Sequence, residues 1–376
     1  MKNVIALMLA LTLCLSLVGC GPSAAPSSSV SEPASSSQAQ EPAEPSSEPA
    51  SSSQAQEPAE PSSEPASSSQ AQEPAEPAAS YVTRVAALKG PTAMGMVQLM
   101  KQEETSGAYE FSIFAAIDEV TPKIVKGEVD IAAVPANMAA VLYNNTQGQI
   151  RVIGINTLGV LYIVESGDSV GSVADLKGKT LYASGKGATP EYALNYILQQ
   201  NGLTPGTDVT IEWKSEHAEC VAALASDPDG IAMLPQPFVA TAQAQNPAIR
   251  IALDLTAEWD AIEAQKEAPS ALLTGVVVAR ADYIDAHPQE LAAFLSGYDE
   301  SVGFVNTETE QAAALIEEYG IVAAPVAQAA LPYCNIVLIQ GAEMKEKLSG
   351  YLNVLFEQNP KAVGGSLPDD AFYYGA

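Results

Sequence analysis

From residue 81 onward, short runs of β-branched and aliphatic residues alternate with stretches in which apolar residues recur every three or four positions. The first pattern is typical of buried strands and the second of amphipathic helices. In the first series the predicted strands are residues 82–88, 110–115, 130–134 and 151–164, and the predicted helices are residues 92–104, 118–126 and 136–144. This alternation predicts an α/β protein in which helices cover a parallel sheet.

A second series of the same kind follows directly. Its predicted strands are residues 179–184, 208–214, 230–234 and 249–253, and its predicted helices are residues 189–201, 216–225 and 238–245. Beyond them come a strand at 274–280 and helices at 288–305, 309–318 and 342–358. We therefore expect two lobes, with residues 81–170 and 271–376 in lobe 1 and residues 171–270 in lobe 2. The chain would cross between them near 164–172 and near 269–274.

The first 19 residues predict a signal peptide, because one lysine precedes an apolar stretch that is too short to span a membrane as a mature helix. The stretch ends in Leu17-Val18-Gly19-Cys20, which resembles the lipobox of bacterial lipoproteins. The resemblance implies cleavage before Cys20 and lipid attachment to its sulfur, which would hold the protein on the outer face of the cytoplasmic membrane. A plain secretory signal is the alternative. We favour a Gram-positive cell surface, with the periplasmic side as the Gram-negative alternative.

Within residues 20–80, residues 31–78 repeat with a period of 16 and consist of Ser, Glu, Pro, Gln and Ala, so that Ser31-Glu32-Pro33 returns as Ser47-Glu48-Pro49 and Ser63-Glu64-Pro65. Such a segment has too little apolar surface to fold by burial, so we expect a disordered tether. A recognition motif for a partner domain is the alternative.

Net charge and cysteine content argue against nucleic-acid binding and against a cysteine metal site. The formal net charge of −28 rules out nucleic-acid binding through a basic surface. After Cys14 and Cys20 are set aside, Cys220 and Cys334 remain, and two distant thiols make a poor metal signature. A disulfide between them stays open, although the two fall in different predicted lobes. We expect no metal and no cofactor.

Three segments carry a family resemblance. They are Lys126-Gly127-Glu128-Val129-Asp130-Ile131-Ala132, Ser172-Val173-Ala174-Asp175-Leu176-Lys177-Gly178-Lys179-Thr180 and Gly185-Lys186-Gly187-Ala188-Thr189. In this order they resemble type II periplasmic binding proteins of the nitrate, sulfonate, taurine and thiamine-precursor group. The resemblance implies a two-lobed fold, each lobe a mostly parallel sheet flanked by helices, with a ligand cleft between them. It also implies an ABC-importer substrate-binding lipoprotein that works with a permease and its ATPase subunit.

The candidate site lies where strands end and helices begin, because helix N-termini there leave free N–H groups that can hold small ligands, especially anions. We expect ligand contacts from Thr92, Ala93, Met94, Asn137, Thr157, Leu158, Gly187, Ala188, Thr189 and Gln236. Helix capping, core packing and turn formation are the alternatives at these positions.

The ligand class stays open between a sulfonate, another small anion, a pyrimidine and a thiamine precursor. A doubly charged anion favours an arginine fork, which the candidate turns lack. The aromatic residues Tyr162, Tyr192, Trp213 and Trp259 could stack on a heterocycle or simply pack in the core.

Catalysis has no motif in its favour. His217 and His287 have no nucleophile or carboxylate partner placed by a motif, and we interpret both as residues at helix starts. We therefore expect a monomeric binding protein and no enzyme. The alternatives are the ligand-sensing subunit of a surface receptor and, behind it, an enzyme on the same fold.

Overall fold

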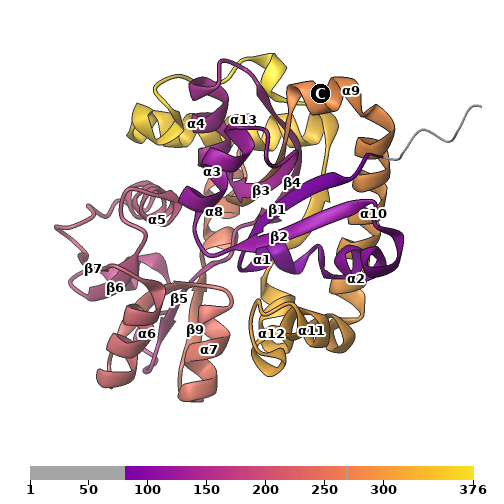
Figure 1. The fold of residues 1–376 in the computed structure, drawn as a ribbon. Helices are drawn as coiled ribbons and strands as arrows, with labels where there is room; N and C mark the ends of the chain where they lie inside the picture. The colour runs from indigo at the N-terminus through magenta and orange to yellow at the C-terminus, as the bar shows by residue number, and fades with distance from the viewer. Residues whose placement is uncertain (1–80, 268) are drawn as a thin grey trace, which may run out of the picture. The chain divides into compact units, whose positions relative to one another are not determined.

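The computed structural model describes residues 81–267 and 269–376. The predicted signal peptide, the predicted lipid attachment at Cys20 and the predicted tether of residues 20–80 lie outside the described residues. Two mixed sheets with flanking helices make up the described part (Figure 1). We name the six-stranded sheet with its helices lobe 1 and the five-stranded sheet with its helices lobe 2.

The lobe 1 sheet has the strand order β11-β4-β10-β3-β1-β2. Its strands are β1 (Thr83–Leu88), β2 (Tyr109–Phe114), β3 (Ile131–Pro135), β4 (Ile150–Leu158), β10 (Leu273–Arg280) and β11 (Ile336–Ile339). Strand β1 is parallel to β2 and β3, whereas β10 is antiparallel to β3 and β4, and β11 is antiparallel to β4. Four of the six strands therefore run in one direction, and the two reversed strands are those added after the chain returns from lobe 2.

The lobe 2 sheet has the order β7-β6-β8-β5-β9. Its strands are β5 (Leu161–Glu165), β6 (Thr180–Ser184), β7 (Thr210–Lys214), β8 (Ile231–Pro235) and β9 (Arg250–Asp254). Strand β6 is parallel to β7 and β8, and β5 is antiparallel to β8 and β9. The predicted α/β class with mostly parallel strands is thus confirmed, and β5 is the one reversed strand of this sheet.

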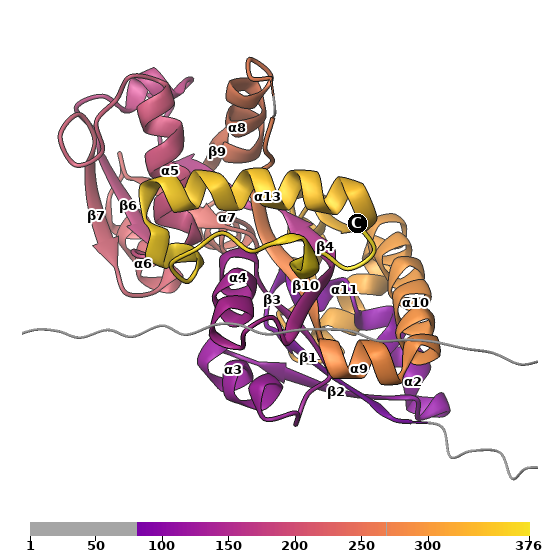
Figure 2. The ribbon, with the colours of Figure 1, turned by 90° about the horizontal axis from the view of Figure 1, so that it is seen from above.

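Helices cover both sheets. Those of lobe 1 are α1 (Pro91–Met94), α2 (Val97–Ser106), α3 (Ile117–Val125), α4 (Ala136–Asn145), α9 (Ala281–Ala286), α10 (Pro288–Thr307), α11 (Thr309–Glu318), α12 (Ala324–Ala330) and α13 (Gly341–Gln358). Those of lobe 2 are α5 (Thr189–Gln200), α6 (His217–Ser226), α7 (Phe238–Gln245) and α8 (Leu255–Glu263). Figure 2 shows α13 extending from lobe 1 to α5, which it contacts.

The core follows the strand period. In β3, Ala132 and Val134 pack into one buried cluster, whereas Ile131 and Ala133 pack into another on the opposite face of the sheet. The first cluster continues into lobe 2 through residues such as Ile163, so the lobes share apolar packing on that side.

The first crossing between lobes differs from the prediction. The largely apolar residues 151–164 predict one extended segment and a crossing near 164–172. The structure instead divides this segment into β4 and β5 and places β5 in the lobe 2 sheet, so the chain crosses at residues 159–160. Gly159 lies at this break. Its backbone comes so close to Thr256 Oγ1 and Leu272 that a Cβ there would overlap both. Hydrophobicity alone could not locate this break, because apolar residues stand on both sides of it.

Four further elements were not predicted, namely β11, α8 and the short helices α9 and α12. Strand β11 has only four residues, too few for a clear periodic signal. Helix α8 contains three acidic residues among nine, which hides its helical apolar pattern, and it buries Leu255 and Trp259.

The two cysteines of the described residues are not paired with each other. Cys220 and Cys334 are buried free thiols in different core clusters, so the disulfide that stayed open in the sequence does not form in this structure. Within the described part of the chain, no helix combines the length and apolar character that a membrane span requires.

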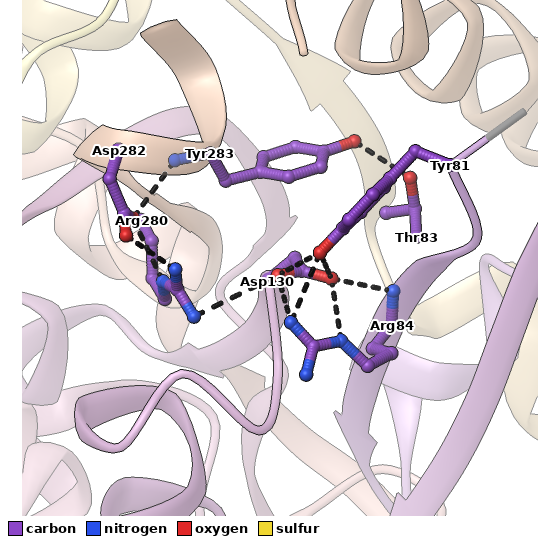
Figure 3. A network of polar contacts seen from close by, with 7 residues as sticks. All are labelled: Tyr81, Thr83, Arg84, Asp130, Arg280, Asp282 and Tyr283. Carbon is purple, nitrogen blue, oxygen red and sulfur yellow. Dashed lines mark hydrogen bonds and ion pairs between the residues drawn. The ribbon is translucent and has the colours of Figure 1, made fainter. Parts of the chain in front are cut away.

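A buried carboxylate joins the amino ends of β1 and β3 to the carboxyl end of β10 (Figure 3). Asp130 has no exposed surface, and it accepts hydrogen bonds from Arg84 Nε and Nη2 at 2.9 and 2.6 Å, from the Arg84 backbone N–H at 2.9 Å and from the Tyr81 hydroxyl. Arg280 lies 3.9 Å away on β10. The hydrogen bonds to Asp130 raise the pKa of Arg84 above its ordinary value. This network joins β1, β3 and β10 at one edge, which leaves the opposite edge for a ligand.

Candidate solute-binding site

A cavity of about 410 Å³ lies at the carboxyl ends of β1, β3 and β8. Both lobes line it. Its polar lining residues are Lys89, Thr92, Asn137, Thr189, His217 and Thr274. The rest of the lining is mainly apolar, with Leu88, Ile117, Met138, Val160 and Leu161 among its side chains. A ligand in this cavity would touch both lobes at once.

A larger cavity, of about 620 Å³, lies at the opposite edge of lobe 1. Its lining includes Arg280, Asp282 and Asp285, and all of its lining residues belong to lobe 1. A ligand there could not stabilise closure of one lobe on the other, because only contacts that differ between two states shift their populations. The cavity between the lobes is therefore the better candidate.

Five helices begin at the candidate cavity. The lining includes first-turn residues of α1, α3, α4, α5 and α6, among them Ile117, Asn137, Thr189 and His217. The first N–H groups of a helix lack intrahelical acceptors and carry partial positive charge. No Asp or Glu lines the cavity among the described residues, although the chain has a net charge of −28. The cavity therefore favours an anionic group, and its apolar wall suits a hydrocarbon part.

Five of the predicted site residues lie together in this lining, namely Thr92, Asn137, Gly187, Ala188 and Thr189. The Thr92 hydroxyl donates to the Leu88 carbonyl at 2.8 Å, so it closes the turn between β1 and α1. The Thr189 hydroxyl donates to Asn137 Oδ1 at 3.4 Å, which joins the lobes beside the cavity.

The other five predicted residues do not line the cavity. Ala93 and Met94 are fully buried in the core of lobe 1, because α1 turns them inward. Thr157 is fully buried on β4, and Leu158 packs against the core that both lobes share. Gln236 is buried and accepts a hydrogen bond from the Ala240 backbone N–H at 3.3 Å, so its side chain serves the start of α7.

Sequence reasoning missed His217 as a site residue. It is partly buried in the cavity lining, and its Nδ1 is hydrogen-bonded to the buried Ser184 hydroxyl, which leaves Nε2 as the nitrogen available to a ligand. Burial lowers the pKa of His217 below its ordinary value, and the Glu216 carboxylate opposes this shift. A signal was present, because His217 begins the helix after β7 as Thr189 begins the helix after β6.

The predicted stacking residues lie elsewhere. Tyr162 and Trp259 are buried in the core, and no Tyr, Trp or Phe belongs to the cavity lining among the described residues. Lys89 lines the cavity, whereas Lys186, in the turn before α5, does not. These positions weaken the case for a stacked heterocycle and strengthen that for a small anion.

Two α/β lobes with a cavity at their facing strand ends define a periplasmic-binding-protein fold. The sequence of residues 96–329 matches the family described as "ABC transporter, phosphonate, periplasmic substrate-binding protein". Because this match covers more than half of the chain, the protein belongs to that family and is a substrate-binding component of an ABC importer. No curated protein matches the chain in sequence.

Solved structures show the same fold. An ABC transporter from Parabacteroides distasonis has a TM-score of 0.66 at 24% identity, with 78% of this chain and 98% of that chain covered. The periplasmic aliphatic sulphonate binding protein SsuA from Escherichia coli has a TM-score of 0.61 at 18% identity, with 76% and 90% covered. The ligand-binding component of an ABC-type import system from Staphylococcus aureus has a TM-score of 0.55 at 16% identity, with 79% and 99% covered. These likenesses confirm the predicted two-lobed binding-protein fold.

Proposed function

We propose that this protein captures a small organic anion with a sulfonate or phosphonate group in the cavity between its lobes and delivers it to an ABC permease. The observation that carries the proposal is the convergence of five helix N-termini on a cavity whose described lining holds no carboxylate. Anions are held at such positions by backbone N–H groups and helix dipoles. The family description and the sulphonate-binding neighbour agree with this ligand class.

The lining also limits the charge of the ligand. Lys89 is the one lysine or arginine among the described lining residues, and His217 supplies a second donor. A dianion is best held by a bidentate arginine, which the lining lacks. We therefore favour a singly charged head group, with the short carbon chain against Ile117, Met138 and Leu161.

Closure of the lobes would follow from contacts on both sides. Thr92 and Asn137 face the ligand from lobe 1, and Thr189 and His217 face it from lobe 2. A ligand that contacts both sets binds the closed state more tightly and shifts the population towards it. The closed state would then be the form that the permease accepts.

The anchoring of the protein is part of the proposal. We expect Cys20 to carry lipid and residues 20–80 to tether a monomeric binding unit to the outer face of the cytoplasmic membrane. Labelling of cells with a fatty-acid analogue should mark the wild-type protein and not the Cys20→Ala variant.

A ligand screen tests the function. The purified protein would be titrated calorimetrically with ethanesulfonate, methylphosphonate, taurine, sulfate, a pyrimidine and a thiamine precursor. We expect saturable binding of an organic sulfonate or phosphonate and weaker binding of sulfate, which lacks an apolar part. Binding of a pyrimidine alone, or of none of these compounds, would contradict the proposed ligand class.

Catalysis is the weaker alternative. Ser184 and His217 form a hydroxyl–imidazole pair, which is one element of a nucleophilic site. The Ser184 side chain is only 2% exposed, however, so a substrate in the cavity meets the imidazole and not the hydroxyl. Ligand sensing is the alternative role for the same cavity, and loss of solute uptake on deletion of the gene would favour transport over sensing.

Anion binding should strengthen as the pH falls, and His217 should be the cause. The ligand-free imidazole has a lowered pKa, so it is neutral near pH 7. An anion beside Nε2 favours the protonated form and raises this pKa, so binding takes up a proton. The affinity for ethanesulfonate, which does not itself titrate here, should rise by at most about tenfold per unit between about pH 7 and pH 5.

The variant His217→Gln serves as the control for this pH dependence, because it keeps a polar side chain but cannot be protonated. Its affinity for ethanesulfonate should not change over the same range. A wild-type protein with a flat pH profile would show that no proton is taken up at His217.

A further inference from the structure

We name residues 185–188, between β6 and α5, the cavity loop, because Gly187 and Ala188 line the cavity. Tyr192 lies where this loop meets the C-terminal end of α13. It lies near the start of α5 and is only 6% exposed, and it does not belong to the cavity lining. Its hydroxyl donates to the Gly187 carbonyl at 3.3 Å and accepts a hydrogen bond from Asn359 Nδ2 at 3.0 Å. Gln358 Nε2 donates to its backbone carbonyl at 3.0 Å. One residue thus connects the cavity loop with a segment more than 160 positions away.

The backbone of Gly187 is held on both sides. Its N–H donates to Glu191 Oε2 at 2.6 Å, and its carbonyl accepts from Tyr192. Its φ of 80° lies in the left-handed region that favours glycine. Because Gly187 lines the cavity, these two bonds set the direction of the backbone that faces the solute.

We name residues 358–363 the C-terminal brace, since they contact both sides of the cavity rim. On the lobe 2 side they hold Tyr192, as described above. On the lobe 1 side, the Ala362 carbonyl accepts from Asn137 Nδ2 at 3.3 Å, and the Val363 carbonyl accepts from Asn144 Nδ2 at 2.8 Å. Asn359 is itself fixed, because its Oδ1 accepts from the Lys361 backbone N–H at 3.1 Å. The brace is therefore an ordered support and not a loose end.

We infer that Tyr192 is a positioning residue, which through its hydroxyl holds the Gly187 loop against the C-terminal brace in the geometry that binds the solute. The inference rests on the proposed function and adds a residue that does not touch the solute itself. Without the hydroxyl, the Gly187 carbonyl and Asn359 Nδ2 both lose their hydrogen bond to Tyr192, so the loop has to be ordered when the ligand arrives. Ordering at that moment weakens binding.

The test compares the full-length Tyr192→Phe variant with wild type in two measurements. Hydrogen–deuterium exchange on the ligand-free proteins reports whether residues 185–191 are held, and calorimetric titration with ethanesulfonate and methylphosphonate reports affinity. We expect faster exchange confined to residues 185–191 and the brace, and about fivefold weaker binding, which corresponds to one lost hydrogen bond. The variant Gln358→Ala, which loses only the contact to the Tyr192 carbonyl, should show a smaller change in the same direction.

The matched control is Tyr182→Phe in the same lobe, whose hydroxyl donates to Asp227 at 3.1 Å and lies outside the cavity lining. It should leave both measurements as in wild type. Unchanged exchange in Tyr192→Phe overturns the inference whatever the ligand proves to be. Faster exchange with equal affinity for a probe that wild type binds also overturns it. If wild type binds neither probe, the ligand class fails separately, and the exchange result alone decides whether Tyr192 holds the loop.

Discussion

The Ala188→Trp variant is expected to lose solute binding, with at least about a hundredfold lower affinity for ethanesulfonate than wild type. Ala188 caps the N-terminus of α5 and lines the cavity between the lobes. An indole at this position would occupy much of the 410 Å³ space and cover the first N–H groups of the helix. Calorimetric titration measures the loss directly.

The substitution should leave the fold intact, because the side chain of residue 188 is partly exposed. Thermal unfolding of the variant checks this. The matched control is Ala225→Trp, which adds the same indole at an exposed position on α6 outside the cavity. It should bind as wild type does. Normal binding by Ala188→Trp would mean that the solute occupies another site, and the proposal would fail.

The Asp130→Ala variant is expected to lower the free energy of unfolding by about 3 kcal/mol, because removal of one partner from a buried ion pair leaves the other groups unmatched. Asp130 is fully buried and receives hydrogen bonds from Arg84 and Tyr81 (Figure 3). Arg84 is 34% exposed, so water can solvate part of its guanidinium, which places the loss at the lower end of the usual range. Chemical denaturation followed by circular dichroism measures it.

The matched control is Asp285→Ala. The Asp285 carboxylate is 70% exposed and lies 3.8 Å from Arg151, and exposed pairs contribute little, so its loss should change stability by less than about 0.5 kcal/mol. Solute affinity should survive in Asp130→Ala, since the network lies at the strand edge opposite the cavity. Equal stability of the two variants would show that the network does not secure the lobe 1 sheet.

The candidate site could be predicted in part, and the individual residues show why. Thr92, Asn137 and Thr189 stand where a strand pattern gives way to a helix pattern, and this local signal places them at the cavity. Met94 and Gln236 stand at similar junctions but point into the core or serve a helix start. Periodicity locates a turn along the chain, but not which side of the turn faces the partner lobe.

The sequence by itself determined the α/β class and the positions of most strands and helices, because these depend on apolar spacing between near neighbours. It also determined the family, through segments of fixed order along the chain. Only the tertiary structure decided that β5 pairs within lobe 2, that His217 lies in the cavity and that Asn359 supports Tyr192. Each of these depends on contacts between residues far apart in the chain, which no local pattern of side chains encodes.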